Sequence, residues 1–409
     1  MSAEVVKAAG VELATPAPEP AAARPSLEGF LDLASARRVR AFHASFPEYE
    51  PTPLVSLNKL AADLGLASLS VKDESARFGL NAFKVLGGSY AIGRYLAREL
   101  GIQEDELTYQ ALMAPEVRER VSRMTFVTAT DGNHGRGVAW TASRLGARSV
   151  VYMPKGSAAE RLENIRACGA EASITDLNYD DAVRLAASKA RENGWVMVQD
   201  TAWPGYEDIP RWIIRGYVTM SLEVFEQLPE RPTHVFVQAG VGSLATSVTG
   251  FLSEAYAPNP PTICVVEPNA AACVFRTARA DDGQLHPVTG DMPTIMAGLA
   301  CGEPCTVGWP VLRAYARHFA SCPDSVAALG MRVLGAPLAG DPRVVSGESG
   351  AVTTGLVVAL MRDERLTPVR ERLGLGPQSR VLCFSTEGDT DKLGYRRVTW
   401  DGAHPYEEA

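Results

Sequence analysis

The sequence has no run of the roughly 18 apolar residues that would indicate a membrane-spanning helix. Its longest apolar candidate, residues 351–361, is interrupted by Thr353, Thr354 and Gly355. The chain also lacks a basic excess, because 40 Lys and Arg stand against 48 Asp and Glu, for a formal net charge of −8. Binding to a phosphate backbone depends on such an excess. We therefore expect neither a membrane span nor a nucleic-acid partner.

Cysteine is scarce, with seven residues scattered through 409. This is not the dense cysteine framework of a small secreted domain, and residues 1–25 have acids where a signal peptide would need a basic start. We therefore expect a cytoplasmic protein with a flexible tail over residues 1–25. Cys301 and Cys305 come closest to a ligand pair, but no second Cys or His pair has the spacing that would complete a zinc site. No metal is predicted.

What the sequence does have is an alternation of short β-branched runs with longer segments whose apolar residues recur every three or four positions. This pattern indicates βαβ units and parallel sheets. Strands are predicted over residues 124–129, 148–153, 171–175, 195–199, 233–238, 261–267 and 380–384. Helices are predicted over residues 135–145, 158–168, 179–192 and 211–227. The length fits a two-lobed α/β enzyme, with residues 281–310 as a long functional loop.

Ligands of open α/β sheets bind where strands end and helices begin, and four segments with unusual chemistry stand out in this sequence. Residues 237–243 read Val-Gln-Ala-Gly-Val-Gly-Ser and follow a predicted strand. Gly240 and Gly242 let the backbone approach an anion, and Ser243 adds a donor at a helix start. The segment predicts a phosphate site, with a plain tight turn as the alternative. Its spacing fits neither a Walker loop nor a dinucleotide fingerprint.

Lys84 lies in the segment Asn-Ala-Phe-Lys-Val-Leu-Gly-Gly-Ser-Tyr, residues 81–90. An apolar neighbourhood and a helix start would both lower the pKa of an amine, which favours a nucleophilic lysine. The alternative is a lysine that extends to water from an apolar helix face.

Two further loops carry polar residues after predicted strands. Residues 130–137 expose amides at a helix start that suit a substrate carboxylate, with Thr130, Asp131, Gly132 and His134 as candidates. Asp131 fits a simple helix cap equally well, and His134 a structural histidine. Residues 384–391 offer the hydroxyls of Ser385 and Thr386 to a heterocycle nitrogen, or form a solvated turn.

The order of these four segments along the chain resembles that of the fold type II, tryptophan synthase β-like pyridoxal-phosphate enzymes. The segments are the lysine segment (residues 81–90), the loop with Gly-Asn-His-Gly (residues 130–137), the glycine-rich loop (residues 237–243) and the Ser-Thr turn (residues 384–391). The resemblance runs from about Phe46 to the end of the chain. It implies two lobes, each an open and largely parallel sheet flanked by helices. Residues 26–77 and 211–409 would form the large cofactor-binding domain and residues 78–210 the small one. It also implies a homodimer.

The resemblance implies a role for each motif residue. Lys84 would hold pyridoxal 5'-phosphate covalently and shuttle a proton. Asn133 would bond the phenolic oxygen of the cofactor, and Ser385 or Thr386 its pyridine nitrogen. The cofactor phosphate would be bound by Ala239, Gly240, Val241, Gly242 and Ser243.

Six stretches, starting at residues 77, 128, 199, 290, 346 and 385, are similar to the branch of the family that eliminates ammonia from 2,3-diaminopropionate. Asp131 stands where dehydratases of the family carry serine. The implied reaction is an α,β-elimination that yields pyruvate and two ammonia molecules. Asp131 would be the base for the D isomer and Asp200 for the L isomer. Because Asp131 opens a helix, we expect its pKa to be lowered.

Two alternatives remain within the same fold: a serine/threonine dehydratase or a β-replacement synthase. A non-catalytic amino-acid sensor is a third reading from a different class. Glu348 and Asp389 lie in stretches that resemble the family, and for each a structural role is as good an interpretation as a functional one.

Overall fold

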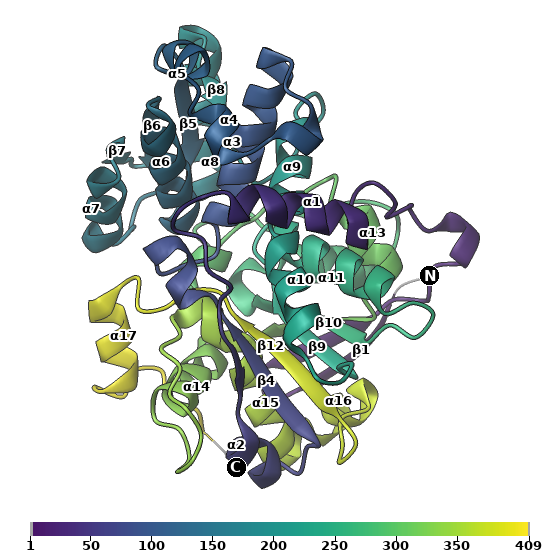
Figure 1. The fold of residues 1–409 in the computed structure, drawn as a ribbon. Coiled ribbons are helices and arrows are strands. Elements are labelled where there is room, and N and C mark those ends of the chain that lie inside the picture. The colour runs from purple at the N-terminus through teal and green to yellow at the C-terminus, as the bar shows by residue number, and fades with distance from the viewer. Residues whose placement is uncertain (1–2, 408–409) are drawn as a thin grey trace.

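The computed structural model describes residues 3–407, which form two lobes, each built on its own sheet (Figure 1). The larger sheet has eight strands in the order β1-β2-β11-β10-β9-β12-β4-β3, and the smaller has four in the order β7-β6-β5-β8. Pairing is parallel throughout the smaller sheet and in the centre of the larger one. This arrangement confirms the predicted α/β class with two largely parallel sheets.

The large sheet is buried on both faces, as parallel strands require. Alternate residues of β9 point to opposite sides: Val235 and Val237 join one apolar cluster, and Phe236 joins the other. Its strands are β1 (Glu4–Ala8), β2 (Val11–Thr15), β3 (Leu54–Ser56), β4 (Ser68–Asp73), β9 (His234–Gln238), β10 (Thr262–Pro268), β11 (His318–Cys322) and β12 (Arg380–Ser385). Its helices are α1 (Leu33–Ala44), α2 (Asn58–Asp63), α10 (Val218–Gln227), α11 (Ser243–Ala255), α12 (Cys273–Ala280), α13 (Trp309–Tyr315), α14 (Asp324–Gly335), α15 (Glu348–Arg362), α16 (Thr367–Leu373) and α17 (Lys392–Thr399).

The small lobe lies at the top of Figure 1 and carries the loop with Asp131. Its strands are β5 (Thr125–Ala129), β6 (Arg148–Met153), β7 (Glu171–Ile174) and β8 (Val196–Met197). Its helices are α3 (Val85–Leu100), α4 (Tyr109–Leu112), α5 (Pro115–Val121), α6 (Asn133–Leu145), α7 (Ala159–Ala167) and α8 (Tyr179–Asn193). Helix α9 (Asp208–Gly216) leads back to the large lobe.

All seven predicted strands are present. For six of them, the first and last residues each lie within one residue of the predicted bounds. The predicted strand over residues 195–199 is shorter, because only Val196–Met197 pairs with β5. The single helix predicted over residues 211–227 is two helices that meet at Tyr217. The break follows Gly216, where α9 contacts α3 so closely that a Cβ atom would lie 2.4 Å from the Leu86 carbonyl oxygen. Residues 281–308 form the predicted long loop, with one short turn of 3-10 helix at Ala297–Leu299.

The interpretation of residues 1–25 as a flexible tail is wrong for residues 4–15, while residues 1 and 2 lie outside the described part of the chain. Strands β1 and β2 form an antiparallel hairpin, and β2 pairs with the large sheet through β11. Val11, Leu13 and Ala14 are buried, so the hairpin is part of the core. Its stability comes from covering the otherwise open edge of β11, a partner that lies some 300 residues away in the sequence. After the hairpin, residues 17–24 are mostly exposed.

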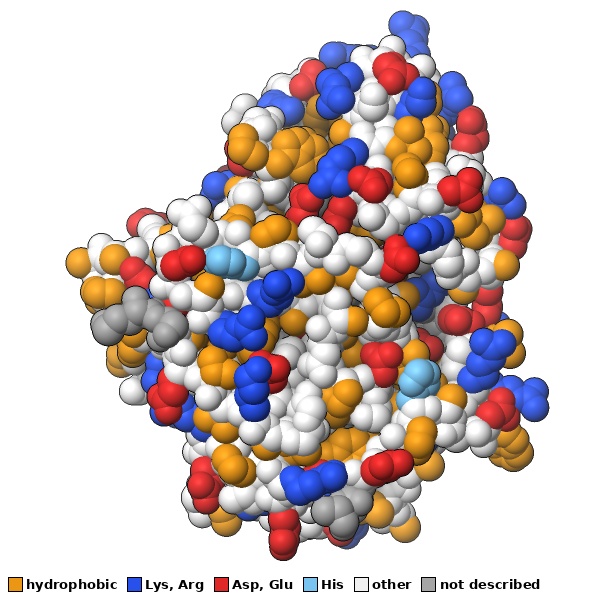
Figure 2. All heavy atoms as spheres, turned by 180° about the vertical axis from the view of Figure 1, so that it is seen from behind, with side chains coloured by type: hydrophobic (Ala, Val, Ile, Leu, Met, Phe, Trp, Pro, Cys, Tyr) orange, Lys and Arg blue, Asp and Glu red, His pale blue; other side chains and the backbone are white. Residues whose placement is uncertain are grey.

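Within residues 3–407, no helix is long and apolar enough to cross a bilayer, and no group of His, Cys, Asp or Glu side chains is arranged to hold a metal ion. All seven cysteines are free thiols. On the face shown in Figure 2, basic and acidic side chains are interspersed and neither sign gathers into one large area.

Candidate active site

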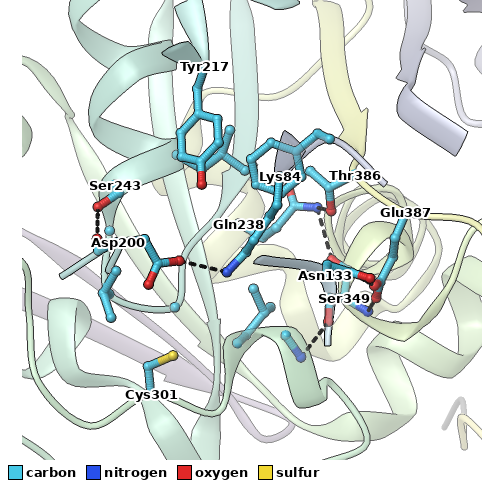
Figure 3. A pocket seen from close by; sticks show the side chains of 17 residues that line it. Lys84, Asn133, Asp200, Tyr217, Gln238, Ser243, Cys301, Ser349, Thr386 and Glu387 are labelled. Carbon is cyan, nitrogen blue, oxygen red and sulfur yellow. Dashed lines mark hydrogen bonds and ion pairs between the residues drawn. The ribbon is translucent and has the colours of Figure 1, made fainter. Parts of the chain in front are cut away.

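The motif residues converge on one pocket between the lobes, into which Lys84 and Asp200 point (Figure 3). Of the residues predicted from sequence, it contains Lys84, Asn133, Asp200, Gly240, Val241, Gly242, Ser243 and Thr386. The other lining residues are Phe83, Tyr217, Gln238, Leu244, Gly298, Leu299, Cys301, Ser349 and Glu387. Parts of the chain from before α3 to beyond β12 therefore meet at the ends of the parallel strands, as expected for an open α/β sheet.

The Lys84 amine lies 2.9 Å from the Asp200 carboxylate. Burial favours the neutral amine, but the attraction of Asp200 and Asp131 outweighs it and raises the pKa of Lys84 above its ordinary value. The expectation of a lowered pKa is therefore wrong for this structure. The sequence pattern showed the apolar neighbours of Lys84 but not the two carboxylates that the fold brings to it.

Asp200 follows β8 and is held in place by several donors. The Tyr179 hydroxyl donates to its Oδ1 at 3.1 Å, and the Ser243 hydroxyl donates to its backbone carbonyl at 2.5 Å. Burial alone would raise the pKa of Asp200, but the Lys84 ammonium and the hydrogen bonds from Lys84 and Tyr179 hold it well below its ordinary value. Asp200 is thus an ionised carboxylate at neutral pH.

The glycine-rich loop lines the pocket at the start of α11. Gly242 has a φ of +98°, a conformation that favours glycine. In the described part of the chain, the amides of Val241, Gly242 and Ser243 donate to no protein acceptor. These amides lie at the start of α11, which is 13 residues long. The dipole of a helix favours an anion at this end. Ala239 lies between the lining residues Gln238 and Gly240 but is not among them, and its amide donates to the Val266 carbonyl in the sheet at 2.9 Å.

The Ser-Thr turn after β12 divides into two different environments. Thr386 lines the pocket and accepts a hydrogen bond from Gln238 at 2.9 Å. Ser385 is fully buried, and its hydroxyl donates to the hydroxyl of Ser346 at 2.8 Å. Thr386 is therefore the hydroxyl of the pair that can reach a bound ring.

Glu387 is a pocket residue that the sequence pattern did not single out. It is 2% exposed and accepts a hydrogen bond from the Asn133 side chain. The alternative of a solvated turn does not hold for Glu387, because its side chain is inside the protein. Tyr217 and Gln238 were also missed: Tyr217 lies at the junction of α9 and α10 and belongs to no motif, and Gln238 ends β9 inside the glycine-rich segment, where the glycines and Ser243 carried the prediction.

Asp131 lies in an adjoining cavity and not among the residues that line the Lys84 pocket. Its Oδ2 lies 3.2 Å from a guanidinium nitrogen of the buried Arg161. Burial raises the pKa of Asp131 despite the nearby Lys84 and Arg161. The expected lowering by the helix start is therefore wrong, because burial has the larger effect.

The other candidates of this loop have structural contacts. The Thr130 hydroxyl accepts from the Gly132 amide at 2.9 Å, and a Cβ atom on Gly132 would meet Arg161 at 2.9 Å. The His134 ring donates to the Val198 carbonyl at 2.8 Å, and burial lowers its pKa. Thr130, Gly132 and His134 thus shape the loop and do not line the Lys84 pocket.

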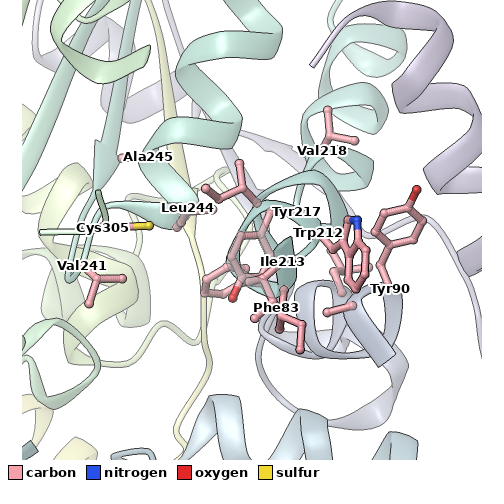
Figure 4. Packing of buried hydrophobic residues seen from close by; sticks show 14 of the residues in the cluster. Phe83, Tyr90, Trp212, Ile213, Tyr217, Val218, Val241, Leu244, Ala245 and Cys305 are labelled. Atoms are coloured by element: carbon pink, nitrogen blue, oxygen red, sulfur yellow. The ribbon is translucent and has the colours of Figure 1, made fainter. Parts of the chain in front are cut away.

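Apolar side chains, among them Phe83, Tyr217 and Ile213, pack around the start of α3 (Figure 4), and Lys84 immediately precedes this helix. The Phe83 ring lies 4.7 Å from that of Tyr217, between centroids. A Cβ atom on Gly87 would come within 2.6 Å of the Tyr217 ring. The glycine after Leu86 is therefore needed for the close contact between α3 and α9, and this contact places Lys84 against the large lobe.

The pocket residues fit pyridoxal phosphate. An amine is available for its aldehyde, free amides at a helix start suit its phosphate, and Thr386 can meet a ring nitrogen. The Tyr217 hydroxyl and the Gln238 Oε1 atom are buried and have no protein hydrogen-bond partner within residues 3–407. Unsatisfied buried polar atoms of this kind are expected where a polar ligand binds.

The family described as pyridoxal-phosphate dependent enzymes matches residues 46–371. The diaminopropionate ammonia-lyase of Salmonella typhimurium is 54% identical over 369 residues, which are 89% of this chain and 91% of that one. The protein of the same name from Escherichia coli K12 is 50% identical over 372 residues, 90% and 92% of the two chains.

Solved structures of other proteins have the same fold. The crystal structure of the Escherichia coli diaminopropionate ammonia lyase in complex with an aminoacrylate-PLP azomethine reaction intermediate superimposes with a TM-score of 0.87 at 44% identity, over 99% of this chain and 100% of that one. Threonine deaminase isoform 2 of Solanum lycopersicum shares the fold at 18% identity, with a TM-score of 0.72. The chain therefore belongs to the fold type II pyridoxal-phosphate dependent enzymes and, within them, to the diaminopropionate ammonia-lyase family.

Proposed function

We propose that this chain catalyses the pyridoxal-phosphate dependent α,β-elimination of 2,3-diaminopropionate, giving pyruvate and two ammonia molecules. The observation that carries the proposal is the placement of one lysine and two aspartates. The Lys84 amine contacts Asp200 at 2.9 Å, and Asp131 is close enough to raise the pKa of the same amine. Relatives that are 54% and 50% identical to this chain and are named diaminopropionate ammonia-lyase support the proposal.

When bound, pyridoxal phosphate supplies a ring that withdraws electrons from the substrate Cα. Lys84 would hold its aldehyde, the amides of residues 241–243 its phosphate, Asn133 its phenolic oxygen and Thr386 its ring nitrogen. Ser385 is a weaker candidate for the nitrogen, because its hydroxyl is engaged by Ser346. A neutral hydroxyl at this nitrogen leaves the ring less fully protonated than a carboxylate would.

The proton at Cα must be removed by a group of this chain. We assign Asp131 to the D isomer and Asp200, with Lys84 beside it, to the L isomer. The two carboxylates come from loops after different strands, β5 and β8, and have different partners, Arg161 and Lys84. A carboxylate with a raised pKa, such as Asp131, is also the stronger base of the two.

The test is pyruvate release from D- and L-diaminopropionate and from D- and L-serine. We expect Asp131→Asn to lose about 100-fold or more of the D-isomer rate and little of the L-isomer rate, and Asp200→Asn the reverse, since general-base groups contribute on that order. Asp181→Asn, on the outer side of α8, is the control and is expected to behave as wild type.

Equal losses for both isomers in each variant would overturn the assignment of the two bases. Equal or faster turnover of serine by the wild type would instead favour the dehydratase reading. A protein without the visible absorbance of bound cofactor would favour the sensor.

We also propose a homodimer that acts in the cytoplasm. The dimer is supported by the family alone, and the location by seven thiols that are all free. Light scattering on the purified protein is expected to give twice the chain mass of 43.8 kDa. Fractionation of the source cells is expected to recover the activity with cytoplasmic markers.

A further inference from the structure

The Tyr217 hydroxyl is an unused hydrogen-bond donor inside the Lys84 pocket. Tyr217 lines this pocket from the junction of α9 and α10, and its hydroxyl points into it (Figure 3). The side chain is 1% exposed, and among residues 3–407 its hydroxyl finds no hydrogen-bond partner. Burying a hydroxyl without a partner opposes folding, so such an atom in a pocket indicates a ligand that satisfies it.

Packing holds this hydroxyl in a fixed place. The Tyr217 ring lies 4.7 Å from the Phe83 ring, between centroids, and so close to Gly87 that a Cβ atom there would come within 2.6 Å of it. Phe83 and Gly87 stand on either side of Lys84 in the sequence, one and three residues away. The donor is therefore already positioned relative to the lysine before a ligand binds, which lowers the entropy cost of binding.

The hydroxyl keeps its proton around neutral pH. Burial, with a smaller contribution from the Asp200 charge, raises the pKa of Tyr217 well above its ordinary value, although the Lys84 ammonium acts in the opposite direction. Tyr217 therefore offers a ligand a neutral O–H group, and a ligand acceptor is what it lacks.

Of the polar groups of pyridoxal phosphate, the phosphate lies on the side of Tyr217. Helix α9, which ends at Tyr217, packs against α11, whose start carries the glycine-rich loop. Cys305 is near enough for its charge to affect the Tyr217 hydroxyl, and the Cys305 amide donates to the Val241 carbonyl of that loop at 2.8 Å. Asn133 and Thr386, proposed for the phenolic oxygen and the ring nitrogen, come instead from α6 and the turn after β12.

The glycine-rich loop itself offers the phosphate only backbone amides. The Ser243 hydroxyl donates its one proton to the Asp200 carbonyl at 2.5 Å. Of the described residues that line the pocket, Lys84 alone has a basic side chain, and the proposed function commits it to the aldehyde. A phosphate has three oxygens that accept strongly, and three amides leave part of this capacity unused. A side-chain donor on this side of the pocket would fill it.

We infer that the Tyr217 hydroxyl donates a hydrogen bond to the cofactor phosphate and thereby strengthens cofactor binding. The inference rests on the cofactor site of the proposed function and is independent of which amino acid the enzyme accepts. A neutral donor that binds an anion in a buried site makes one of the stronger hydrogen bonds in proteins.

The test compares cofactor binding with and without the phosphate group. The full-length protein is freed of cofactor with hydroxylamine and titrated with pyridoxal phosphate or with pyridoxal, and the visible absorbance is followed. In Tyr217→Phe we expect the Kd of pyridoxal phosphate to rise about 10- to 100-fold, the range for a hydrogen bond to a charged group. The Kd of pyridoxal should stay within about 3-fold. Tyr95→Phe, on α3 beside Phe126, is the control and should match wild type.

Melting temperatures provide a second measurement that a structural role would change differently. Without cofactor, Tyr217→Phe should melt at or above the wild-type temperature, because the hydroxyl that it removes has no partner. With cofactor bound, it should melt below wild type. The phosphorus NMR signal of the bound cofactor should also shift in Tyr217→Phe and not in Tyr95→Phe.

An equal rise in Kd for pyridoxal phosphate and pyridoxal, or no rise for either, would overturn the inference. So would a cofactor-free Tyr217→Phe protein that melts below wild type or does not fold, because the hydroxyl would then have a structural role. A wild type that binds pyridoxal phosphate but releases no pyruvate from diaminopropionate would overturn the proposed function and leave this inference standing.

Discussion

Lys72, Glu74, Arg77 and Glu223 are charged and almost fully buried beneath the segment that carries Lys84. Glu223 Oε2 lies 2.7 Å from the amine of Lys72 and 2.7 Å from the guanidinium of Arg77, and Arg77 also pairs with Glu74 at 2.8 Å. The cluster joins β4 to α10 just before the chain reaches Lys84. Lys72 is thus a structural lysine, distinct from Lys84, which faces the pocket.

Glu223→Gln should destabilise the protein by about 3–5 kcal/mol, because it leaves two buried cations without their shared anion. Glu226→Gln, on the same helix, removes a partly exposed pair with Arg40 and should cost about 1 kcal/mol or less. Urea unfolding of the two variants checks the difference. Similar midpoints would show that the cluster contributes little.

The same residue predicts a dependence on acid pH. Burial opposes ionisation of Glu223, but Arg77 and Lys72 lower its pKa to about 2, below the ordinary 4.5. Because the folded pKa is lowered, the stabilisation is complete above about pH 4.5 and is lost as the pH falls toward 2. The stability gap between wild type and Glu223→Gln should therefore narrow from pH 5 to pH 3. A constant gap in urea titrations would contradict this.

Among the elements, three helices approach one another through glycines. A Cβ atom on Gly137 of α6 would lie 2.8 Å from the Cα of Val85 at the start of α3. On the other side of α3, Gly216 of α9 lies against the Leu86 backbone. Gly137 and Gly216 therefore allow the helices to pack closely, whereas Gly240 and Gly242 line the Lys84 pocket.

Gly137→Ala should push α6 and α3 apart and cost about 1–3 kcal/mol, with weaker retention of the cofactor because Val85 directly follows Lys84. Gly88→Ala is the matched control in α3, since its Cβ would meet Val138 at an ordinary 3.5 Å. The control should be neutral or stabilising by up to about 1 kcal/mol, from the higher helix propensity of alanine. Thermal melts and cofactor absorbance after dialysis distinguish the two outcomes.

At the scale of the whole molecule, the first strands complete the large sheet. Residues 3–15 belong to the large lobe, together with residues 26–77 and 211–407. Residues 78–210 remain our proposal for the small domain. The Lys84 pocket lies where these two parts meet, since Asp200 and Asn133 come from one and the glycine-rich loop from the other.

Leu13→Ala should destabilise the large lobe by about 2–5 kcal/mol, because Leu13 is fully buried. Val5→Ala, in the partly exposed strand of the same hairpin, should cost about 1 kcal/mol or less. Removing residues 1–16 should have a larger effect than Leu13→Ala, with aggregation through the uncovered edge of β11. Unfolding curves and light scattering report both effects, and an unchanged truncated protein would contradict the role of the hairpin.

The predictable parts of the protein were those with a local signal. The strands before residues 130–137, 237–243 and 384–391 are short, largely apolar runs, and these loops and the Lys84 segment carry glycine, hydroxyl and amide residues in a family-like order. Gln238 and Glu387 lie inside the segments 237–243 and 384–391, but only the fold shows that their side chains line the pocket. Tyr217 escaped prediction because nothing in its neighbouring residues marks it. The hairpin was missed for the same reason, since its partner β11 is remote in the sequence.

The sequence by itself determined the α/β class and the order of the motifs, and it singled out Lys84 as a candidate, because each of these depends on residues that are neighbours along the chain. Only the tertiary structure decided the charge states around that lysine and the position of Tyr217. A pKa depends on burial and on charges within a few ångströms, and here those charges come from loops that only folding brings together.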